Sequence, residues 1–219
     1  MAKRLLWLGS SRRDIGRSPK PARRVAGFQL LRIQQGLEPN DWKPMASIGS
    51  GVQEIRVHTK TEHRVCTSPG SLRASTYCTL SRNVPGRPPV PTSSLRGRVI
   101  ESCWNTGGEK AMERTKGKIA RSSGNVFRDL GFGHEEAEHL MIRSELMIKI
   151  EKLLKARSLT QAEAAKIMRV SQPRVSDLLR GRLDLFSADA LIDMLARLGV
   201  SVRLAFASSK SRKVAQHWS

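Results

Sequence analysis

The sequence has few acidic and few aromatic residues and no long apolar run. Of its 219 residues, 19 are Asp or Glu against 39 Lys or Arg, so the formal charge is +20. With only 5% aromatic residues, one large core is under-supplied. No apolar run approaches the roughly 18 residues that a transmembrane helix needs. Three cysteines, an odd number, argue against a secreted disulfide scaffold. We therefore expect a soluble, cytoplasmic protein with an anionic partner, most simply nucleic acid.

The first hundred residues are the more basic part of the chain. They carry 18 Lys and Arg against five acids, whereas residues 101–219 carry 21 against 14. Composition and periodicity predict folded segments near both ends and an unpatterned middle. The predicted divisions are a small α+β fragment at 1–65, a disordered linker at 66–111, a mostly polar arm at 112–143, a helical domain at 144–206 and a disordered basic tail at 207–219.

The first fragment reads as strand, helix and hairpin. LLWL near the start suggests a short strand, and apolar residues at helical spacing follow Pro21 up to a stop at Gly36. VQEIRVHT and EHRV alternate, which predicts a hairpin. WLGSS, QLLRIQQGLEPNDWKPM and SIGSGVQEIRV resemble the N-terminal half of the Gp49-like toxins of the HigB/RelE type, which are ribosome-dependent mRNA interferases. The resemblance covers about residues 5–65.

The resemblance stops where residues 66–98 begin. This stretch has ten Ser or Thr, five Pro and five Arg, with no Lys and no acid, and shows no helix or strand period. One interpretation is a disordered linker, because such a composition buries too little apolar surface to fold. The interpretation we prefer is a segment translated in the wrong reading frame, since GC-rich coding DNA read out of frame yields this composition. GGEK before Met112 can encode a purine-rich ribosome-binding site, which suggests a second gene start fused by frameshift. Cys66, Cys78 and Cys103 lack metal-ligand spacing.

The strongest pattern lies between residues 144 and 206. Apolar spacing predicts four helices, and VSVRLAF alternates like a strand at Val200–Phe206. Thr160 and Glu163 form a capping box, and Ser171 with Pro173 starts the next helix. Gly181 ends that helix. Two short helices joined by a tight turn are a helix-turn-helix.

These residues carry a second resemblance. LTQAEAAKIMRVSQPRVSDLLRG resembles the Cro/C1-type (XRE) DNA-binding module, and residues 112–206 as a whole resemble HigA-type antitoxins. The family usually has Gly where Arg169 stands, and a left-handed non-Gly residue there costs roughly 1 kcal/mol. The predicted fold class is therefore mainly α: a Cro/C1-type helix-turn-helix bundle with a C-terminal strand, preceded by a truncated RelE-like α+β fragment and a disordered linker.

The predicted site is the exposed face of the second helix of the motif. Gln172 can pair with adenine and Arg174 with guanine, while Asp177 either accepts from cytosine or orients Arg174. Ser171 can contact base or phosphate. The resemblance implies phosphate contacts at Thr160, Gln161, Arg180 and Arg182. An ordinary solvated helix face is the alternative for Gln172 and Arg174.

The function expected from this pattern is a sequence-specific transcriptional regulator of antitoxin type that represses its own toxin–antitoxin operon. Its partners would be double-stranded operator DNA and a second copy of the chain, since dimers read two half-sites. The resemblance adds an intact HigB/RelE-type toxin as a candidate partner, with SSGNVFRDLGF either as a toxin-contacting arm or as a flexible leader. No cofactor is expected. His134 and His139 do not share a helix face, so no metal site is expected either.

Two other functions remain open at the level of sequence. One is a RelE-type mRNA interferase, for which Arg56, His58 and Arg64 are possible remnants, although alternation along an exposed strand explains them equally well. The missing C-terminal strands and helix of such a toxin argue against an enzyme. The other is a non-specific basic nucleic-acid binder driven by residues 1–100, which would show no sequence preference.

Overall fold

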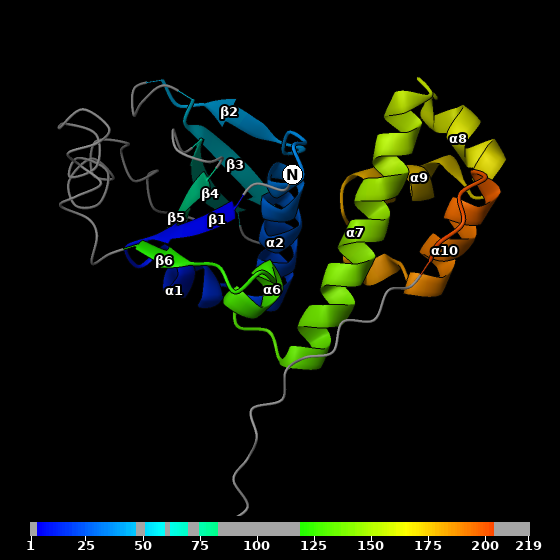
Figure 1. Cartoon of the computed structure of the whole chain (residues 1–219). Helices are drawn as coiled ribbons and strands as arrows, with labels where there is room; N and C mark the ends of the chain where they lie inside the picture. Colours follow the sequence, from blue (N-terminus) through cyan, green and yellow to red (C-terminus); the bar gives the residue numbers. More distant parts are fainter. Residues whose placement is uncertain (1–3, 47–50, 60–61, 70–74, 83–118, 204–219) are drawn as a thin grey trace, which may run out of the picture.

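The computed structural model describes residues 4–46, 51–59, 62–69, 75–82 and 119–203 (Figure 1). We call the part from 4 to 82 the sheet half and the part from 119 to 203 the helical half. The sheet half contains β1 (Arg4–Leu8), α1 (Ser11–Gly16), α2 (Lys20–Gln34), β2 (Trp42–Pro44), β3 (Gln53–His58), β4 (Glu62–Pro69) and β5 (Ser75–Arg82). The helical half contains β6 (Ile119–Arg121), α6 (Val126–Asp129), α7 (His134–Ala156), α8 (Gln161–Met168), α9 (Gln172–Leu179), the 3-10 turn η2 (Leu183–Leu185) and α10 (Ala188–Arg197).

The six strands form one sheet in the order β2-β3-β4-β5-β1-β6. β1 runs parallel to β5, and all other neighbours are antiparallel. β6 belongs to the helical half and pairs with β1 through Leu6, Trp7 and Leu8. The helical half therefore covers an edge of the sheet that would otherwise offer unpaired backbone groups to another chain.

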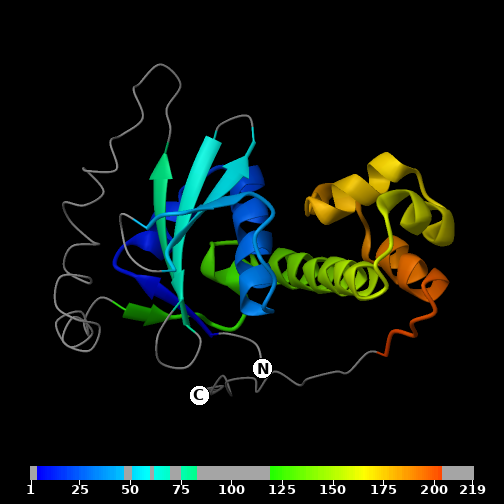
Figure 2. The same cartoon turned by 90° about the horizontal axis from the view of Figure 1, so that it is seen from above.

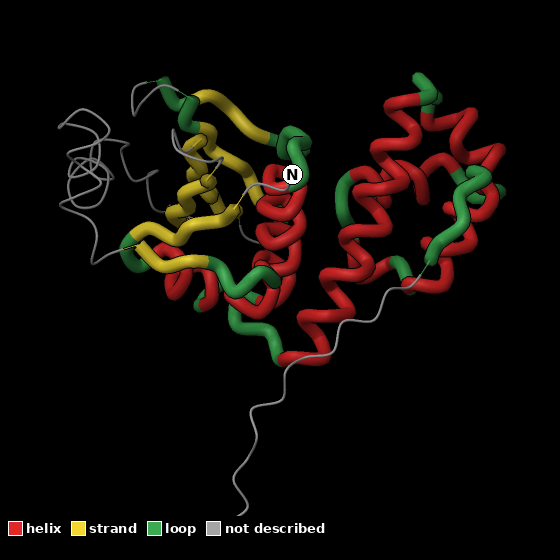
Figure 3. The backbone as a smooth tube through the Cα atoms, viewed as in Figure 1, coloured by secondary structure: helices red, strands yellow, loops and turns green. Residues whose placement is uncertain are grey.

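The predicted strand, helix and hairpin of the first fragment are confirmed. Pro21 lies in the first turn of α2, where its missing N–H costs nothing, and Gly36 follows the helix with φ +80°. β3 and β4 pair in the predicted hairpin, so that the alternating residues Ile55 and Val57 enter the core. In the tube view α2 runs beside the strands (Figure 3), and it contacts β3.

The predicted linker at 66–111 needs a correction where it is described. β4 continues to Pro69, and residues 75–82 form β5 between β4 and β1. β5 pairs with β4, its neighbour in the sequence, and with the distant β1. Because strand formation depends strongly on such partners, the absence of a period in its own residues did not reveal it. The remainder of that stretch, which includes Cys103 and the start at Met112, lies outside the described residues, as does the predicted tail at 207–219.

The helical half contains the four predicted helices, but its boundaries differ from those expected. α7 begins at His134 and runs unbroken to Ala156, so the predicted boundary between 143 and 144 falls inside a helix. The reason is a continuous apolar face, on which Ala137 and Leu140 are as buried as Ile150. Residues 200–203 are not a strand, since they have no neighbour to pair with among the described residues, and 204–206 lie outside those residues.

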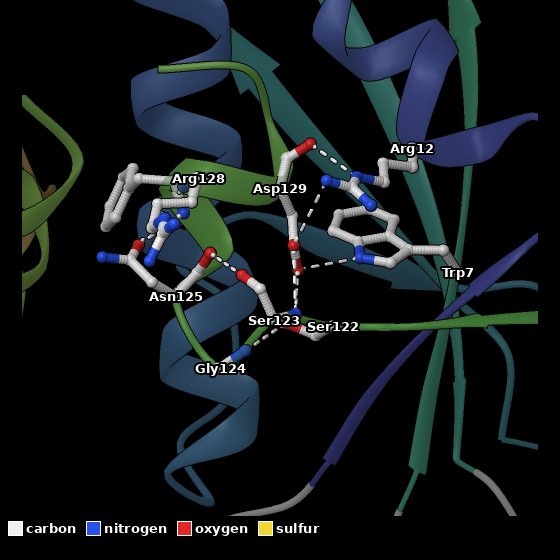
Figure 4. A network of polar contacts seen from close by, with 9 residues as sticks. Trp7, Arg12, Ser122, Ser123, Gly124, Asn125, Arg128 and Asp129 are labelled. Atoms are coloured by element: carbon white, nitrogen blue, oxygen red, sulfur yellow. Dashed lines mark hydrogen bonds and ion pairs between the residues drawn. The ribbon is translucent and has the colours of Figure 1, made fainter. Parts of the chain in front are cut away.

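One contact between the halves is built around the buried carboxylate of Asp129 (Figure 4). Its side chain is fully buried, and it accepts hydrogen bonds from Nε1 of Trp7 (3.0 Å) and from the backbone N–H of Ser123 (3.1 Å). Arg12 donates to the Asp129 carbonyl at 3.0 Å. Asn125 caps α6 by accepting from the N–H of Phe127. A buried carboxylate with several donors ties α6 to β1 and α1.

A second contact joins α2 to α7. The guanidinium of Arg32 forms an ion pair and hydrogen bond with Glu151, and the two side chains are only 3% and 5% exposed. Arg24 bonds Glu136 at 3.0 Å, and this hydrogen bond lowers the pKa of that half-buried carboxyl. Arg23 donates to the carbonyl of Leu130 at 2.8 Å. The predicted arm therefore packs on the sheet half from β6 to the first turn of α7.

Apolar packing continues through the same junction. A Cβ at Gly27 of α2 would lie 2.6 Å from the ring of Phe127, so α2 and α6 approach as closely as a bare backbone allows. The buried residues of both halves form one hydrophobic cluster. Seen from above, α7 extends from the sheet side to the remaining helices (Figure 2). Among the described residues, no helix is both long and apolar enough to cross a membrane.

Candidate nucleic-acid interface

The first helix of the motif, α8, begins with the predicted capping box. The backbone N–H of Glu163 donates to Oγ1 of Thr160 at 3.3 Å, and the Glu163 carboxylate accepts from the N–H of Thr160 at 2.8 Å. Two backbone donors that the helix leaves free are thereby bonded. The Thr160 hydroxyl also donates to the Glu163 carboxylate at 2.7 Å. This bond, followed by the one from the Thr160 backbone N–H, lowers the pKa of the Glu163 carboxyl.

The turn between α8 and α9 is left-handed at Arg169. This residue has φ 53° and ψ 48°. The left-handed conformation, which the family usually gives to Gly, is therefore adopted here by a non-Gly residue. The side chain of Arg169 is exposed. Arg197 of α10 donates to the carbonyl of Met168 at 2.6 Å, so a neighbouring helix bonds one of the last carbonyl groups of α8. The turn is thus fixed from outside the motif as well as within it.

The second helix, α9, buries one face and leaves the other free. Val175 and Leu178 are buried, and Leu179, predicted to point inward, is half-buried. Ala164 and Ala165 of α8 are buried as expected, and α8 contacts α9. Small side chains at this point let the two helices approach closely. The candidate base-reading residues Ser171, Gln172 and Arg174 are all exposed.

Arg174 lies over an aromatic ring. Its guanidinium carbon is 4.7 Å from the ring centroid of Phe186, and an Nη atom lies 3.5 Å from the carbonyl of Leu185. Stacking of this kind limits the rotamers of a long side chain while its edge nitrogens stay available as donors. Sequence reasoning missed Phe186 as a partner, because the only signal is an aromatic residue shortly after the motif.

Asp177 pairs with Arg182 rather than with Arg174. The Arg182 Nε lies 3.4 Å from the Asp177 carboxylate, and the Arg182 N–H donates to the Asp177 carbonyl at 3.1 Å. Arg182 is still 55% exposed in its side chain. The structure therefore assigns Asp177 to holding the segment after α9, and it leaves Arg182 near the helix end where a phosphate contact was expected.

The other candidate phosphate contacts lie at the ends of the two helices. Thr160 and Gln161 are exposed at the start of α8, where backbone N–H groups and the helix dipole attract anions. Arg180 is exposed at the C-terminal cap of α9. With Arg182, these residues flank the exposed face of α9 at both ends of the motif.

The possible remnants of a ribonuclease site are engaged with acids. Arg56 lies 3.8 Å from Asp41, and Nε2 of His58 lies 2.5 Å from the same carboxylate. Arg64 lies 3.4 Å from the buried Glu54. Arg56 and Arg64 face each other across the β3–β4 pair, which shows that they share one face of the sheet.

Cys66 is the one cysteine whose surroundings are described. It is buried in β4, and burial, with a smaller contribution from the charge of Glu54, raises the pKa of its thiol to about 11. A thiol that stays protonated at neutral pH is a poor nucleophile and a poor metal ligand. The side chain of Cys78 and all of Cys103 lie outside the described residues.

Comparison with known proteins gives the class of the helical half. Residues 126–206 match a family model described as a helix-turn-helix domain. This span contains α8, the turn at Arg169 and α9, together with α6, α7 and α10. No curated protein matches the chain. The helical half is therefore a helix-turn-helix domain, and this class of module supports a DNA-binding regulator.

Proposed function

We propose that this chain is a sequence-specific transcriptional regulator of the antitoxin type that binds its own operator and represses it. The observation that carries the proposal is the exposed face of α9 in a capped helix-turn-helix. Ser171, Gln172 and Arg174 are exposed together on a helix whose opposite face is held by buried Val175 and Leu178. A helix presented in this way fits the major groove.

The roles within the site follow from donor and acceptor chemistry. The side-chain amide of Gln172 can donate to N7 of adenine and accept from its N6 amino group. The guanidinium of Arg174 can donate to both O6 and N7 of guanine. Ser171 contacts a base or phosphate. Thr160 and Gln161 on one side, and Arg180 and Arg182 on the other, would hold the DNA backbone and set the register. The Phe186 ring supports this reading because it orients Arg174 before DNA arrives.

One module of this size binds weakly, so we propose a homodimer that reads two half-sites about one helical turn apart.

A separate toxin is the second partner to consider for a protein of the antitoxin type. The arm that would contact a toxin by resemblance is packed on the chain's own toxin-like half through Asp129, Arg23 and Arg24. A separate HigB/RelE-type toxin would have to displace that half, and we propose that it binds weakly or not at all.

We propose no ribonuclease activity for the sheet half. Arg56, His58 and Arg64 each contact Asp41 or Glu54, and such pairing is the usual arrangement of charged residues on a structural strand. A translation assay with the full chain tests this point, since an interferase would stop protein synthesis and cleave the message.

The test of the proposed function is a gel shift of the full chain on the DNA upstream of its own gene. Scrambled DNA of the same length and composition serves as competitor. We expect specific retardation, and Arg174→Ala should weaken operator binding by roughly 1–3 kcal/mol, or about fivefold to 150-fold. Loss of affinity for scrambled DNA should be much smaller, because that binding depends on phosphates alone.

Arg128→Ala is the matched control. Arg128 is exposed on α6, outside the motif, and its substitution removes the same charge as Arg174→Ala. It should leave the ratio of operator to scrambled binding unchanged. Equal affinity for both DNAs in the unmodified chain would contradict the proposal and favour a non-specific basic binder.

A further inference from the structure

The C-terminal end of α9 lies against the sheet half. Nδ2 of Asn40 donates a hydrogen bond to the carbonyl of Leu179 at 2.8 Å. Leu179 is the last residue of α9, and carbonyl groups in the last turn of a helix have no donor within that helix. A residue 139 positions away in the sequence therefore bonds the end of the candidate DNA-reading helix.

The turn after α9 is seated on an aromatic ring of α2. Gly181 has φ +72°, and a Cβ placed there would lie 2.1 Å from the ring of Phe28. Only glycine satisfies both the left-handed conformation and this close approach. The backbone at the end of α9 thus rests directly on Phe28, which is itself buried.

Asn40 and Phe28 each have a further contact within the sheet half. The N–H of Asn40 donates to Oε1 of the buried Gln29 at 3.0 Å. The Arg32 guanidinium lies 5.8 Å from the ring centroid of Phe28, and Arg32 also donates to the carbonyl of Glu38 at 2.7 Å. Because Arg32 is paired with Glu151 on α7, the support under α9 and the helix bundle around it form one framework.

Support at this point matters because α9 is short. It has eight residues, and the free energy of such a helix comes from packing rather than from its own hydrogen bonds. The segment just beyond its end carries Arg180 and Arg182, the candidate phosphate contacts on this side. A helix end that is already ordered loses less conformational entropy when it binds DNA.

We propose that the sheet half positions α9 for base readout, with Asn40 as a positioning residue and Phe28 as its support. This inference rests on the proposed DNA-binding function and adds a role for residues 28–40, which lie in the segment 1–65 that the sequence suggested is a truncated toxin fragment. It names a surface of the chain, the contact of Asn40 and Phe28 with Leu179 and Gly181, on which sequence-specific affinity depends.

A rival explanation for any effect of the sheet half is its positive charge. Charge attracts all DNA alike, so it raises operator and scrambled binding together and weakens with salt. Asn40 is uncharged, and its removal leaves the electrostatic attraction as it was. The two explanations therefore differ in the ratio of operator to scrambled affinity.

The experiment uses the full chain with Asn40→Ala and, as control, Arg13→Ala. Arg13 is exposed on α1, and its substitution removes one positive charge from the sheet half. Asn40→Ala should weaken operator binding about fivefold, the equivalent of one net hydrogen bond, and should weaken scrambled binding less, because that binding does not require α9 in one position. Arg13→Ala should change both affinities by the same small factor. Amide exchange at residues 178–183 without DNA should be faster in Asn40→Ala alone.

The outcomes separate the inference from the function on which it rests. If the unmodified chain prefers its operator but Asn40→Ala binds both DNAs as the unmodified chain does, the positioning role is wrong. A gain in operator affinity would also overturn it, since it would show that the contact holds α9 back. If the unmodified chain shows no operator preference, the proposed function itself fails, and the inference falls with it.

Discussion

The two halves of the molecule use their arginines in different ways. Four arginines of the sheet half bond to groups of residues 129–151, namely Arg12, Arg23, Arg24 and Arg32. In the helix-turn-helix, Arg169, Arg174 and Arg180 are exposed. The half with the larger charge excess thus uses several of its arginines to bind the other half. Net charge indicates an anionic partner, but it does not locate the surface that meets it.

The largest effect is expected from breaking the buried pair between the halves. Arg32→Ala leaves Glu151 buried opposite an empty site, which should lower the free energy of unfolding by about 3–5 kcal/mol. Lys155, which lies 2.9 Å from Glu151, offsets only part of the loss because its own side chain is 60% exposed. Urea denaturation followed by circular dichroism measures the change.

Arg13→Ala is the control for this comparison, because it removes an exposed arginine of the same half and should cost less than about 0.5 kcal/mol. The double variant Arg32→Leu with Glu151→Leu should regain much of the lost free energy, since apolar residues can replace a buried pair. A loss below about 1 kcal/mol in Arg32→Ala would mean that the halves are not joined as the structure shows.

A smaller effect is expected where the halves meet through apolar packing. In Gly27→Ala, the new methyl group must displace the fully buried ring of Phe127. The overpacking should cost about 1–3 kcal/mol, and the better helix propensity of alanine should offset about 1 kcal/mol of it, so the free energy of unfolding should fall by up to about 2 kcal/mol. Thermal and urea unfolding measure it.

Gly16→Ala provides the matched control on α1. Its Cβ would lie 3.7 Å from the nearest atom, the carbonyl oxygen of Leu130, which is ordinary contact. This variant should be neutral or slightly stabilising. Equal losses in the two variants would show that helix–helix distance at Gly27 is not what limits the junction.

The smallest effect concerns the capping box, which lies in the helical half alone. The pKa of Glu163 is lowered in the folded chain by its hydrogen bonds with Thr160. A lowered carboxyl pKa means that the contribution to stability is complete above the unfolded value of 4.5 and is lost as the pH falls through the folded value. The melting temperature should therefore be higher for the unmodified chain than for Glu163→Gln at pH 6, and the two should converge as the pH falls below 4.5 through the lowered pKa of the folded chain.

Thr160→Ala distinguishes this cap from a general charge effect. Without the hydroxyl and its hydrogen bond, the difference made by Glu163→Gln should become smaller at pH 6, whereas Thr160→Ser should preserve it. A difference that is the same in all three backgrounds would contradict the reciprocal cap. Because Glu163 is exposed and lies away from the contacts between the halves, that junction should be unaffected.

Local signals predicted the helix-turn-helix well. Thr160 and Glu163, the left-handed Arg169, Pro173 at the start of α9 and Gly181 after its end act within a few residues of one another. Their physics is contained in a short stretch of chain: a free N–H is bonded nearby, or a turn needs a particular φ. For that reason the motif and its exposed face could be read without the fold.

Signals for the other elements were not local. β5 pairs with β4 on one side and with the distant β1 on the other. Its sequence is rich in Ser and Thr and lacks the apolar alternation that would indicate a strand. α6 and the first turns of α7 were expected to be polar arm because their burial is against α2. The bond from Trp7 to Asp129 joins residues 122 positions apart, and no spacing rule reaches so far.

The sequence by itself determined the class of the helical half, because capping, turn conformation and helical periodicity are properties of neighbouring residues. Only the tertiary structure decided that the sheet half is packed on the helical half, that its arginines bond across the junction, and that Asn40 and Phe28 support the end of α9. Those contacts depend on which surfaces meet when buried groups must find partners, and only the folded chain brings such distant residues together.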